Sequence, residues 1–211
     1  MSEELKSNLA RKMIDAKIRN QCVILRRYTR NGSIDTEKEI LAMQNLRGKL
    51  LFCKCVEEIM GYEGAAARIY FLTLGKLIDS EFTFSGRNKR PPLDPFNSMI
   101  SLGYSIILNE IYGKLEGKGL NPYFGILHKD RKKHPTLASD MMEEWRAVLL
   151  DKEGFKKYIG KLENKFHADQ KYLSYIDYRV SFRRALDLQV NQLTKAIEEN
   201  DASLYMPVVI R

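Results

Sequence analysis

The sequence predicts an all-α fold, a helical bundle, and three observations carry that prediction. Apolar residues recur at spacings of three and four through much of the chain, which is the period of an amphipathic helix. No stretch alternates apolar and polar residues as a half-buried strand does, and no internal repeat stands out. Glycine, proline and asparagine gather in a few short segments that separate the helical stretches. The 211 residues are enough for one principal domain, so we expect a single helical domain over 1–211.

The first predicted helix runs from about Glu4 to Arg30, a stretch without glycine or proline. Leu5, Leu9 and Met13 recur on one face of it, which is the face expected to enter the core. The remaining surface of this helix is expected to be strongly basic and exposed. Its basic residues are Arg11, Lys12, Lys17, Arg19, Arg26, Arg27 and Arg30.

A second helix is expected from Thr36 to about Met60, because Thr36 and Glu39 have the spacing of a capping box. The next stretch, GYEGAAARIYFLTLGKLI, carries glycines at positions Gly61 and Gly64. These two glycines predict a break or a close approach of two backbones. The alanine-rich and aromatic remainder predicts a buried helix.

The clearest loop is SGRNKRPPLDPF, which combines glycine, a basic cluster and two adjacent prolines. Asp94 followed by Pro95 is typical of an N-cap and the first helical position, so a helix is expected from there to about Leu115. The segment EGKGLNPYFG predicts the next turn region, and LYMPVVIR a short extended tail. Further helices are expected at about 136–150, 152–166 and 172–199.

The charge of the chain suggests a polyanionic partner. Lys and Arg outnumber Asp and Glu by 35 to 27, which gives a net charge of +8 and a pI near 9.3. Nucleic acids bind such surfaces because each neutralised phosphate releases condensed counterions. A basic protein without a nucleic acid partner remains an open alternative from charge alone.

The compartment is expected to be cytoplasmic. The N-terminus lacks the positive and apolar regions of a signal peptide, and no apolar run approaches the ~18 residues of a membrane span, so no membrane association is expected. The three cysteines, Cys22, Cys53 and Cys55, are an odd number and are expected to be reduced thiols, with a zinc site the weaker alternative.

Two acids near the middle of the chain share one helical face. Asp140 and Glu143 are three residues apart, whereas Glu144 is rotated by about 100° from Glu143. A solvated helix surface is the ordinary explanation of such a pair. His128 lies upstream in a loop that can fold back over them, and one histidine with several carboxylates suits Mg²⁺ or Mn²⁺ better than structural Zn²⁺.

Glu63 is a stronger indication of a site, because it lies in a largely apolar stretch. An unpaired charge buried there would cost several kcal/mol, so a partner is required. An ion pair with Arg68 and a metal shared with His128 are both compatible with the sequence.

Two basic clusters lie in loops that adjoin these acids. A phosphodiester substrate explains both kinds of residue, because its oxygens bind a metal while flanking phosphates bind lysine and arginine. The clusters are Arg87, Lys89 and Arg90, and Lys129, Arg131, Lys132 and Lys133.

Four ordered motifs closely resemble those of a known family. They are MGYEGAAARIYF, GRNKRPPLDPFNSMISLGYSIILNEIYG, GLNPYFGILHKD and TLASDMMEEWR, and DAKIRNQCVILRRY near the start is similar to the opening helix of the same family's helical domain. The family is the CRISPR-associated spacer-acquisition integrase, the universal CRISPR adaptation protein. Its members usually carry a β-rich domain before this helix, for which these 211 residues leave no room.

The resemblance implies a set of site residues. Glu63, His128 and Glu143 match the family's metal ligands for Mg²⁺ or Mn²⁺, and Asp140 is the adjacent catalytic acid. Arg87, Arg90 and Arg146 are implied to contact phosphates or a second subunit. With them, Lys89, Lys129, Arg131, Lys132 and Lys133 complete the expected DNA-binding set.

The resemblance also implies a reaction and partners. The 3′-hydroxyl ends of a short prespacer duplex would attack phosphodiesters at CRISPR repeat boundaries, a metal-dependent transesterification. Two such attacks imply a homodimer or a pair of dimers, with the family's small ferredoxin-like protein as a further partner. A metal-dependent nuclease acting on branched DNA and a catalytically idle DNA-binding scaffold are the alternatives.

Overall fold

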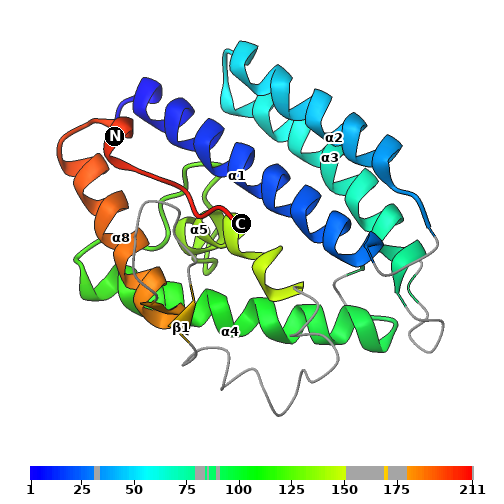
Figure 1. The fold of residues 1–211 in the computed structure, drawn as a ribbon. Coiled ribbons are helices and arrows are strands. Elements are labelled where there is room, and N and C mark those ends of the chain that lie inside the picture. The colour runs from blue at the N-terminus through cyan, green and yellow to red at the C-terminus, as the bar shows by residue number, and fades with distance from the viewer. Residues whose placement is uncertain are drawn as a thin grey trace.

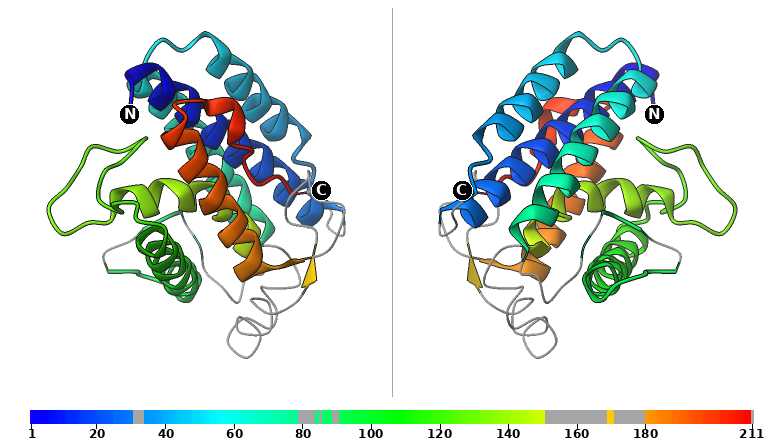
Figure 2. Two further views of the ribbon diagram at one scale, coloured as in Figure 1. Left: turned by 90° about the vertical axis from the view of Figure 1, so that its left-hand side faces the viewer. Right: turned by 90° about the vertical axis from the view of Figure 1, so that its right-hand side faces the viewer.

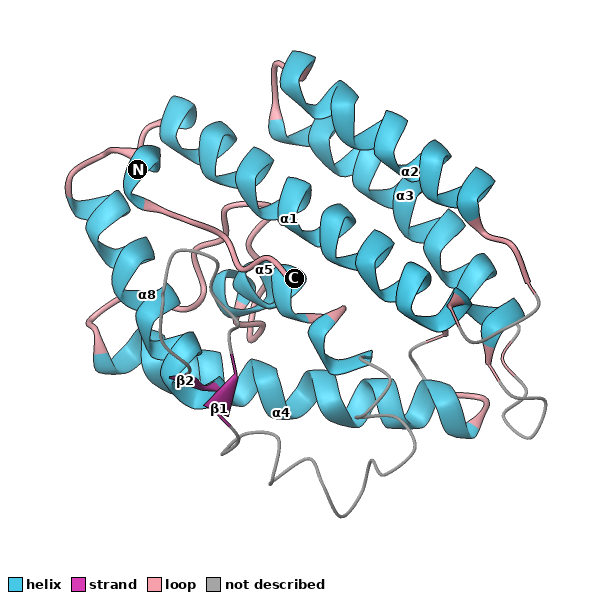
Figure 3. Ribbon diagram, in the orientation of Figure 1, coloured by secondary structure: helices cyan, strands magenta, loops and turns pink. Residues whose placement is uncertain are grey.

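The computed structural model describes residues 1–30, 34–78, 84, 86–88, 91–150, 169–170 and 180–210. Helices dominate this part of the chain, which confirms the predicted all-α fold (Figure 1, Figure 3). The α-helices are α1 (Glu3–Thr29), α2 (Glu37–Lys49), α3 (Val56–Leu77), α4 (Pro95–Gly117), α5 (Thr136–Trp145) and α8 (Phe182–Glu198). Short 3-10 turns occupy Leu50–Phe52, Val148–Leu150 and Ala202–Leu204, and a two-stranded antiparallel ribbon pairs β1 (Asp169–Gln170) with β2 (Val180–Ser181).

Helix α1 is the central element of the bundle. It packs against α2 and α3 on one side and against α5 on another, as the views in Figures 1 and 2 show. The Ser2 hydroxyl caps it by accepting a hydrogen bond from the Leu5 amide at 3.2 Å. Because neighbours cover it on several sides, residues well beyond one apolar stripe are buried. Lys17, which its spacing placed on an exposed basic face, is only 4% exposed, so that prediction was wrong for this residue.

The helix predicted to reach Met60 is two helices, α2 and α3. The Thr36 hydroxyl pairs with the Thr29 hydroxyl at 2.8 Å and does not cap α2, so the predicted capping box was wrong. Between the helices the chain leaves the helical path, and Arg11 of α1 donates to the carbonyl oxygens of Leu50 and Cys53 at 3.0 and 3.1 Å. This contact from another helix satisfies groups that the break exposes.

The break predicted at Gly61 and Gly64 was also wrong, because α3 runs through both positions without interruption. A β-carbon added at either glycine would meet nothing within 4 Å. Neither glycine therefore serves a turn or a close approach. Glu63 lies between them on a continuous helix, which gives its side chain a fixed direction.

Helix α4 starts as predicted, since the Asp94 carboxylate accepts from the Asn97 amide at 2.7 Å and Pro95 takes the first helical position. Helix α5 and the following 3-10 turn match the expected helix at 136–150. The helix expected at 152–166 lies outside the described residues. The one expected at 172–199 was too long, because β2 occupies Val180–Ser181 and α8 begins at Phe182, capped by the Ser181 hydroxyl.

Residues 205–210 form an extended segment, as predicted, which we call the C-terminal arm (red in Figure 1). It lies against α1 and α5. The Ile210 amide donates to the Asn20 side chain at 2.8 Å, and the Val208 amide donates to the Glu144 carboxylate at 2.7 Å. Tyr205 and Val208 are fully buried. The arm therefore completes the core between two helices that are distant in sequence.

The three cysteines carry free thiols in the structure, which agrees with the expected reduced state. Among the helices of the described residues, none has both the length and the apolar character that a bilayer crossing requires.

Candidate active site

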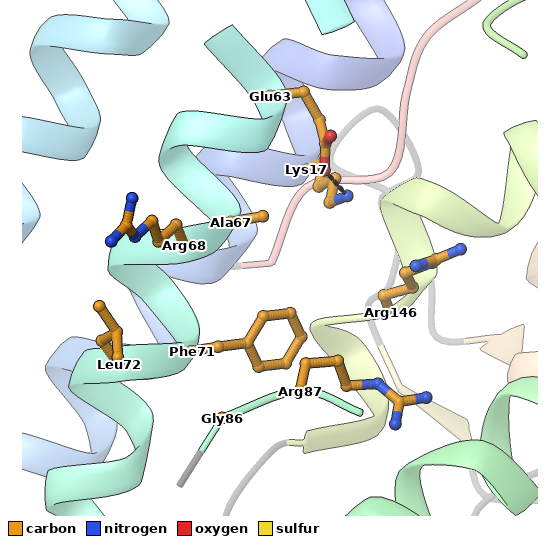
Figure 4. Close-up of a pocket in the computed structure, with 9 residues that line it drawn as sticks. All are labelled: Lys17, Glu63, Ala67, Arg68, Phe71, Leu72, Gly86, Arg87 and Arg146. Atoms are coloured by element: carbon orange, nitrogen blue, oxygen red, sulfur yellow. Dashed lines mark hydrogen bonds and ion pairs between the residues drawn. The ribbon is translucent and has the colours of Figure 1, made fainter. Parts of the chain in front are cut away.

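Three helices bring the predicted acids together. Glu63 projects from α3 and Glu143 from α5, and Lys17 of α1 lies between them. The Lys17 ammonium donates to the Glu143 carboxylate at 2.5 Å and also to the Glu63 carboxylate. The sequence left an ion pair between Glu63 and Arg68 open. The structure instead pairs Glu63 with Lys17, and Figure 4 shows Arg68 turned away from the Glu63 carboxylate.

Asp140 anchors the loop that carries His128. Its Oδ1 lies 2.6 Å from His128 Nδ1, and its Oδ2 accepts from the Ile126 and Leu127 amides at 2.6 and 2.8 Å. This arrangement fixes the imidazole and leaves Nε2 as the nitrogen for a ligand. The loop approaches Asp140 so closely that a β-carbon on Gly125 would lie 3.0 Å from Asp140 Oδ2 and 2.5 Å from the His128 carbonyl. Glycine is therefore required at this position.

The charges of the site stabilise one another. Burial opposes ionisation of Glu143, but Arg146, with its Nη2 2.8 Å from Oε1, and Lys17 outweigh burial and lower the Glu143 pKa to about 2. Burial likewise opposes the charge of Lys17, and the two carboxylates raise its pKa. The hydrogen bond with Asp140 raises the pKa of His128. Both carboxylates are thus kept in an arrangement that binds positive charge.

Two carboxylates and an imidazole are the donor chemistry that Mg²⁺ and Mn²⁺ accept, so the residues fit the predicted ion in kind. In the part of the chain that the structure describes, however, no three His, Cys, Asp or Glu side chains come together closely enough to hold a metal. The position between Glu63 and Glu143 is taken by the Lys17 ammonium. The carboxylates already hold a cation, and the ligand set stays a prediction.

A pocket of about 400 Å³ opens beside this cluster. Figure 4 shows Glu63 and Lys17 at one end of it, Arg146 beside them and Arg87 further away, with the Phe71 ring entering from α3. The two guanidinium groups lie over the Tyr104 ring, 5.6 Å (Arg87) and 5.0 Å (Arg146) from its centroid. Such a concentration of cations favours an anionic ligand.

The same two arginines keep unused hydrogen-bond donors. Arg87 donates to the Asn97 side chain at 2.8 Å and to Ser101 Oγ at 3.1 Å, and Arg146 pairs with Glu143. Their buried Nε atoms nevertheless find no partner among the described residues. A phosphate in the pocket would offer acceptors to the outer nitrogens of these guanidinium groups, since the Nε atoms themselves are buried.

Four of the predicted DNA contacts lie on the loop between α4 and α5. Figure 2 shows this loop, in yellow-green, standing out from the helices. All four of these side chains are exposed, and an antiparallel bridge between residues 131 and 134 shapes the tip. They are Lys129, Arg131, Lys132 and Lys133. Lys89 and Arg90 lie outside the described residues.

Sequence reasoning gave no role to Glu144, which the structure shows to be fully buried. Tyr205 donates to it at 2.5 Å, the Val208 amide at 2.7 Å and Gln189 at 3.1 Å. Because these partners carry no positive charge, burial dominates and raises the Glu144 pKa to about 8. Its position one residue after Glu143 turns it away from the charged cluster and toward the C-terminal arm. No local pattern in the sequence could predict these partners, because they come from α8 and the C-terminal arm, which are distant in sequence.

Comparison with known proteins identifies the family to which the chain is similar. The model of the family described as CRISPR associated protein Cas1 matches residues 1–186. Two Mycobacterium tuberculosis proteins named CRISPR-associated endonuclease Cas1 are 35% identical over 236 residues, covering 96% of this chain and 68% of each relative. A Thermus thermophilus protein named CRISPR-associated endonuclease Cas1 3 is 39% identical over 143 residues, covering 68% of this chain and 41% of that relative.

Solved structures share the fold. A casposase bound to integration product aligns with a TM-score of 0.79 at 22% identity, over 97% of this chain and 64% of that one. A Cas6-RT-Cas1–Cas2 complex aligns with a TM-score of 0.81 at 23% identity, over 98% of this chain and 25% of that one. The family match over most of the residues, together with the identity to the M. tuberculosis proteins, shows that the chain belongs to the CRISPR associated protein Cas1 family.

Proposed function

We propose that this chain is the catalytic helical part of a CRISPR adaptation integrase, which joins the 3′-hydroxyl ends of short prespacer duplexes to repeat boundaries by transesterification. The observation that carries the proposal is the meeting of Glu63 and Glu143 around a buried cation, beside a pocket lined by arginines. The names of the Cas1 relatives and the casposase bound to integration product support it.

Glu63, Glu143 and the Nε2 atom of His128 would hold the Mg²⁺ or Mn²⁺ ion. When bound, the ion supplies stabilisation of the negative charge that grows on the phosphate oxygens in the transition state. Asp140 does not need to touch the ion, because its contact with His128 Nδ1 already orients the imidazole.

The cations around the site would bind the DNA. Arg87 and Arg146 line the pocket beside Glu63, and we propose that they contact the phosphate that reacts. The exposed basic residues of the loop between α4 and α5 would contact phosphates further along the duplex, and this part of the affinity falls steeply with salt. Base readout is not required of these contacts, because phosphate contacts position the duplex without reading its sequence.

Joining both strands of one prespacer needs two sites, so we propose that the chain acts as a homodimer or pair of dimers. A Cas2 partner is proposed from the Cas6-RT-Cas1–Cas2 complexes that share the fold. Size-exclusion chromatography with light scattering, with and without DNA, tests the assembly. A monomer under every condition would contradict it.

A plasmid assay tests the reaction. A supercoiled plasmid that carries a CRISPR repeat is incubated with fluorescent short duplexes and Mn²⁺, with EDTA as the metal-free control. Relaxed plasmid that carries the label supports integration, relaxation without label supports a nuclease, and binding alone supports a DNA scaffold. EDTA should abolish both labelling and relaxation.

Glu63→Ala is the test variant of the site. It removes one proposed ligand and should abolish labelling while leaving duplex affinity nearly unchanged. Glu57→Ala is the matched control, because Glu57 is an exposed glutamate on the same helix. Full activity of Glu63→Ala would remove Glu63 from the site.

A further inference from the structure

Lys17 is a charged residue of the site to which the proposed reaction gives no role. Its ammonium is buried and contacts both Glu63 and Glu143, which come from different helices. Glu143 is buried and Glu63 is partly buried, so the two carboxylates would repel each other and lose much of their hydration without a cation between them. Lys17 supplies that cation from α1.

The divalent ion and the ammonium compete for the same place. A small divalent cation binds carboxylate oxygens at roughly 2.1 Å and needs the lone pairs directed into the gap. Those lone pairs now point at Lys17, whose Nζ is 2.5 Å from Glu143 Oε2. Both cations cannot occupy this gap, and their charges repel.

The adjoining pocket gives the ammonium a destination. Lys17 lines the pocket beside Glu63, Arg146 lies next to it on the shared Glu143 carboxylate, and Arg87 lies further along the pocket (Figure 4). The four-carbon stem of a lysine lets its head group move by rotation about side-chain bonds while α1 stays in place. An ammonium that leaves the carboxylates would join the two guanidinium groups around whatever anion the pocket holds.

We propose that Lys17 is an exchangeable resident cation: it holds Glu63 and Glu143 until the divalent ion binds, and its ammonium then moves into the pocket to contact the substrate phosphate. This inference rests on the proposed function, since it takes the two glutamates as metal ligands and a phosphodiester as the ligand of the pocket. Metal binding and phosphate binding then favour each other through one side chain.

The first test measures Mn²⁺ affinity without DNA. Electron paramagnetic resonance of free Mn²⁺ gives the affinity of the wild-type protein, of Lys17→Met, of Lys12→Met and of Glu63→Ala, which reports the binding that depends on Glu63. Lys12 is a matched control on α1, because its ammonium bonds the carbonyl oxygens of Ala202 and Tyr205. Removing the competitor should tighten Mn²⁺ binding by about ten-fold or more in Lys17→Met alone. Equal or weaker binding would overturn the inference.

The second test uses only the wild-type protein, so it stands even where Lys17→Met fails to fold. Lysines are acetylated briefly with and without Mn²⁺ or Mg²⁺, and the extent at each lysine is read by mass spectrometry. Lys17 is shielded in the ion pair and should become several-fold more reactive when the metal releases it, while Lys12 stays unchanged. A reactivity of Lys17 that does not rise with metal contradicts the exchange.

The two tests separate this inference from the proposed function. Absence of any Mn²⁺ binding that depends on Glu63 would overturn the metal-dependent function itself. Mn²⁺ binding that depends on Glu63, with Lys17 still shielded, would overturn the exchange alone.

Discussion

Glu143 and Glu144 are adjacent on α5 and both are buried, yet their surroundings shift their pKa values in opposite directions. Glu143 faces Lys17 and Arg146, which lower its pKa to about 2. Glu144 faces Tyr205, Gln189 and a backbone amide, and burial raises its pKa to about 8. Equal burial therefore does not determine ionisation. The charge of the partner does, and one helical step of about 100° is enough to change partners.

The two sides of α5 also make different contacts. On one side Glu143 pairs with Lys17 and Arg146, which line the pocket, and Asp140 holds His128. The Glu144 side ties α5 to α8 and the C-terminal arm. Substitutions on the first side should change activity more than stability, and substitutions on the second side should do the reverse.

The largest contrast is expected between Glu143→Gln and Glu144→Gln. Replacing a ligand carboxylate by an amide should lower the integration rate by about 10³-fold, because the charge that holds the metal is lost. Glu144→Gln should keep a rate within about 3-fold of wild type, since it does not face the pocket. Initial rates of duplex joining to plasmid measure both. Equal losses of integration rate in the two variants would show that the two sides of α5 do not differ in function.

The stability of the wild-type protein should fall with rising pH because of Glu144. Its folded-state pKa lies above the usual 4.5, so its neutral form favours folding. The contribution is fully present below pH 4.5 and is lost as pH rises through about 8. Glu144→Gln cannot ionise and should gain on the order of 3 kcal/mol over wild type between pH 5 and pH 9. Urea unfolding at the two pH values tests this, and parallel curves for both proteins would contradict it.

Asp140→Asn should reduce metal affinity by about 10- to 100-fold. The amide oxygen can still accept from the Ile126 and Leu127 amides, but the NH₂ group would face His128 Nδ1 and force the ring proton to Nε2. Mn²⁺ titration measures the affinity, and thermal melting in EDTA should show little change. A large loss of melting temperature with unchanged metal affinity would show that Asp140 supports the fold rather than metal binding.

Tyr205→Phe should have the smallest effect. It removes one hydrogen bond to Glu144 and should cost about 1 kcal/mol in the free energy of unfolding. Its integration rate should equal that of wild type at a temperature where both proteins are folded. A clear loss of integration rate at that temperature would show that contacts between Glu144 and the C-terminal arm affect the reaction.

Spacing along the chain was sufficient to predict the orientation of α5. A separation of three residues placed Asp140 and Glu143 on one face and Glu144 on another, and the structure agrees. The start of α4 was also predictable, because the residues that determine it, Asp94 as N-cap and Pro95 at the first helical position, lie at that start. Features encoded within one turn of helix were therefore predictable from the sequence.

The wrong predictions concern residues whose surroundings depend on another helix. The period of α1 placed Lys17 on its polar side, but α3 and α5 cover that side and bury it. The break between α2 and α3 has no glycine or proline at its centre, and Arg11 of α1 bonds the carbonyl oxygens it leaves exposed. The assignments of Glu63, His128 and Glu143 as ligands came from the family resemblance rather than from physical pattern alone.

The C-terminal arm gives the fold contacts between residues that are far apart in sequence. The Ile210 amide bonds Asn20 and the Val208 amide bonds Glu144, with 190 and 64 positions between the partners. Chain entropy must be lost before such distant partners meet, so contacts of this kind slow folding relative to the local contacts within helices. We therefore expect the arm to dock late in folding, and the helix that carries Glu143 to gain its last support at that step.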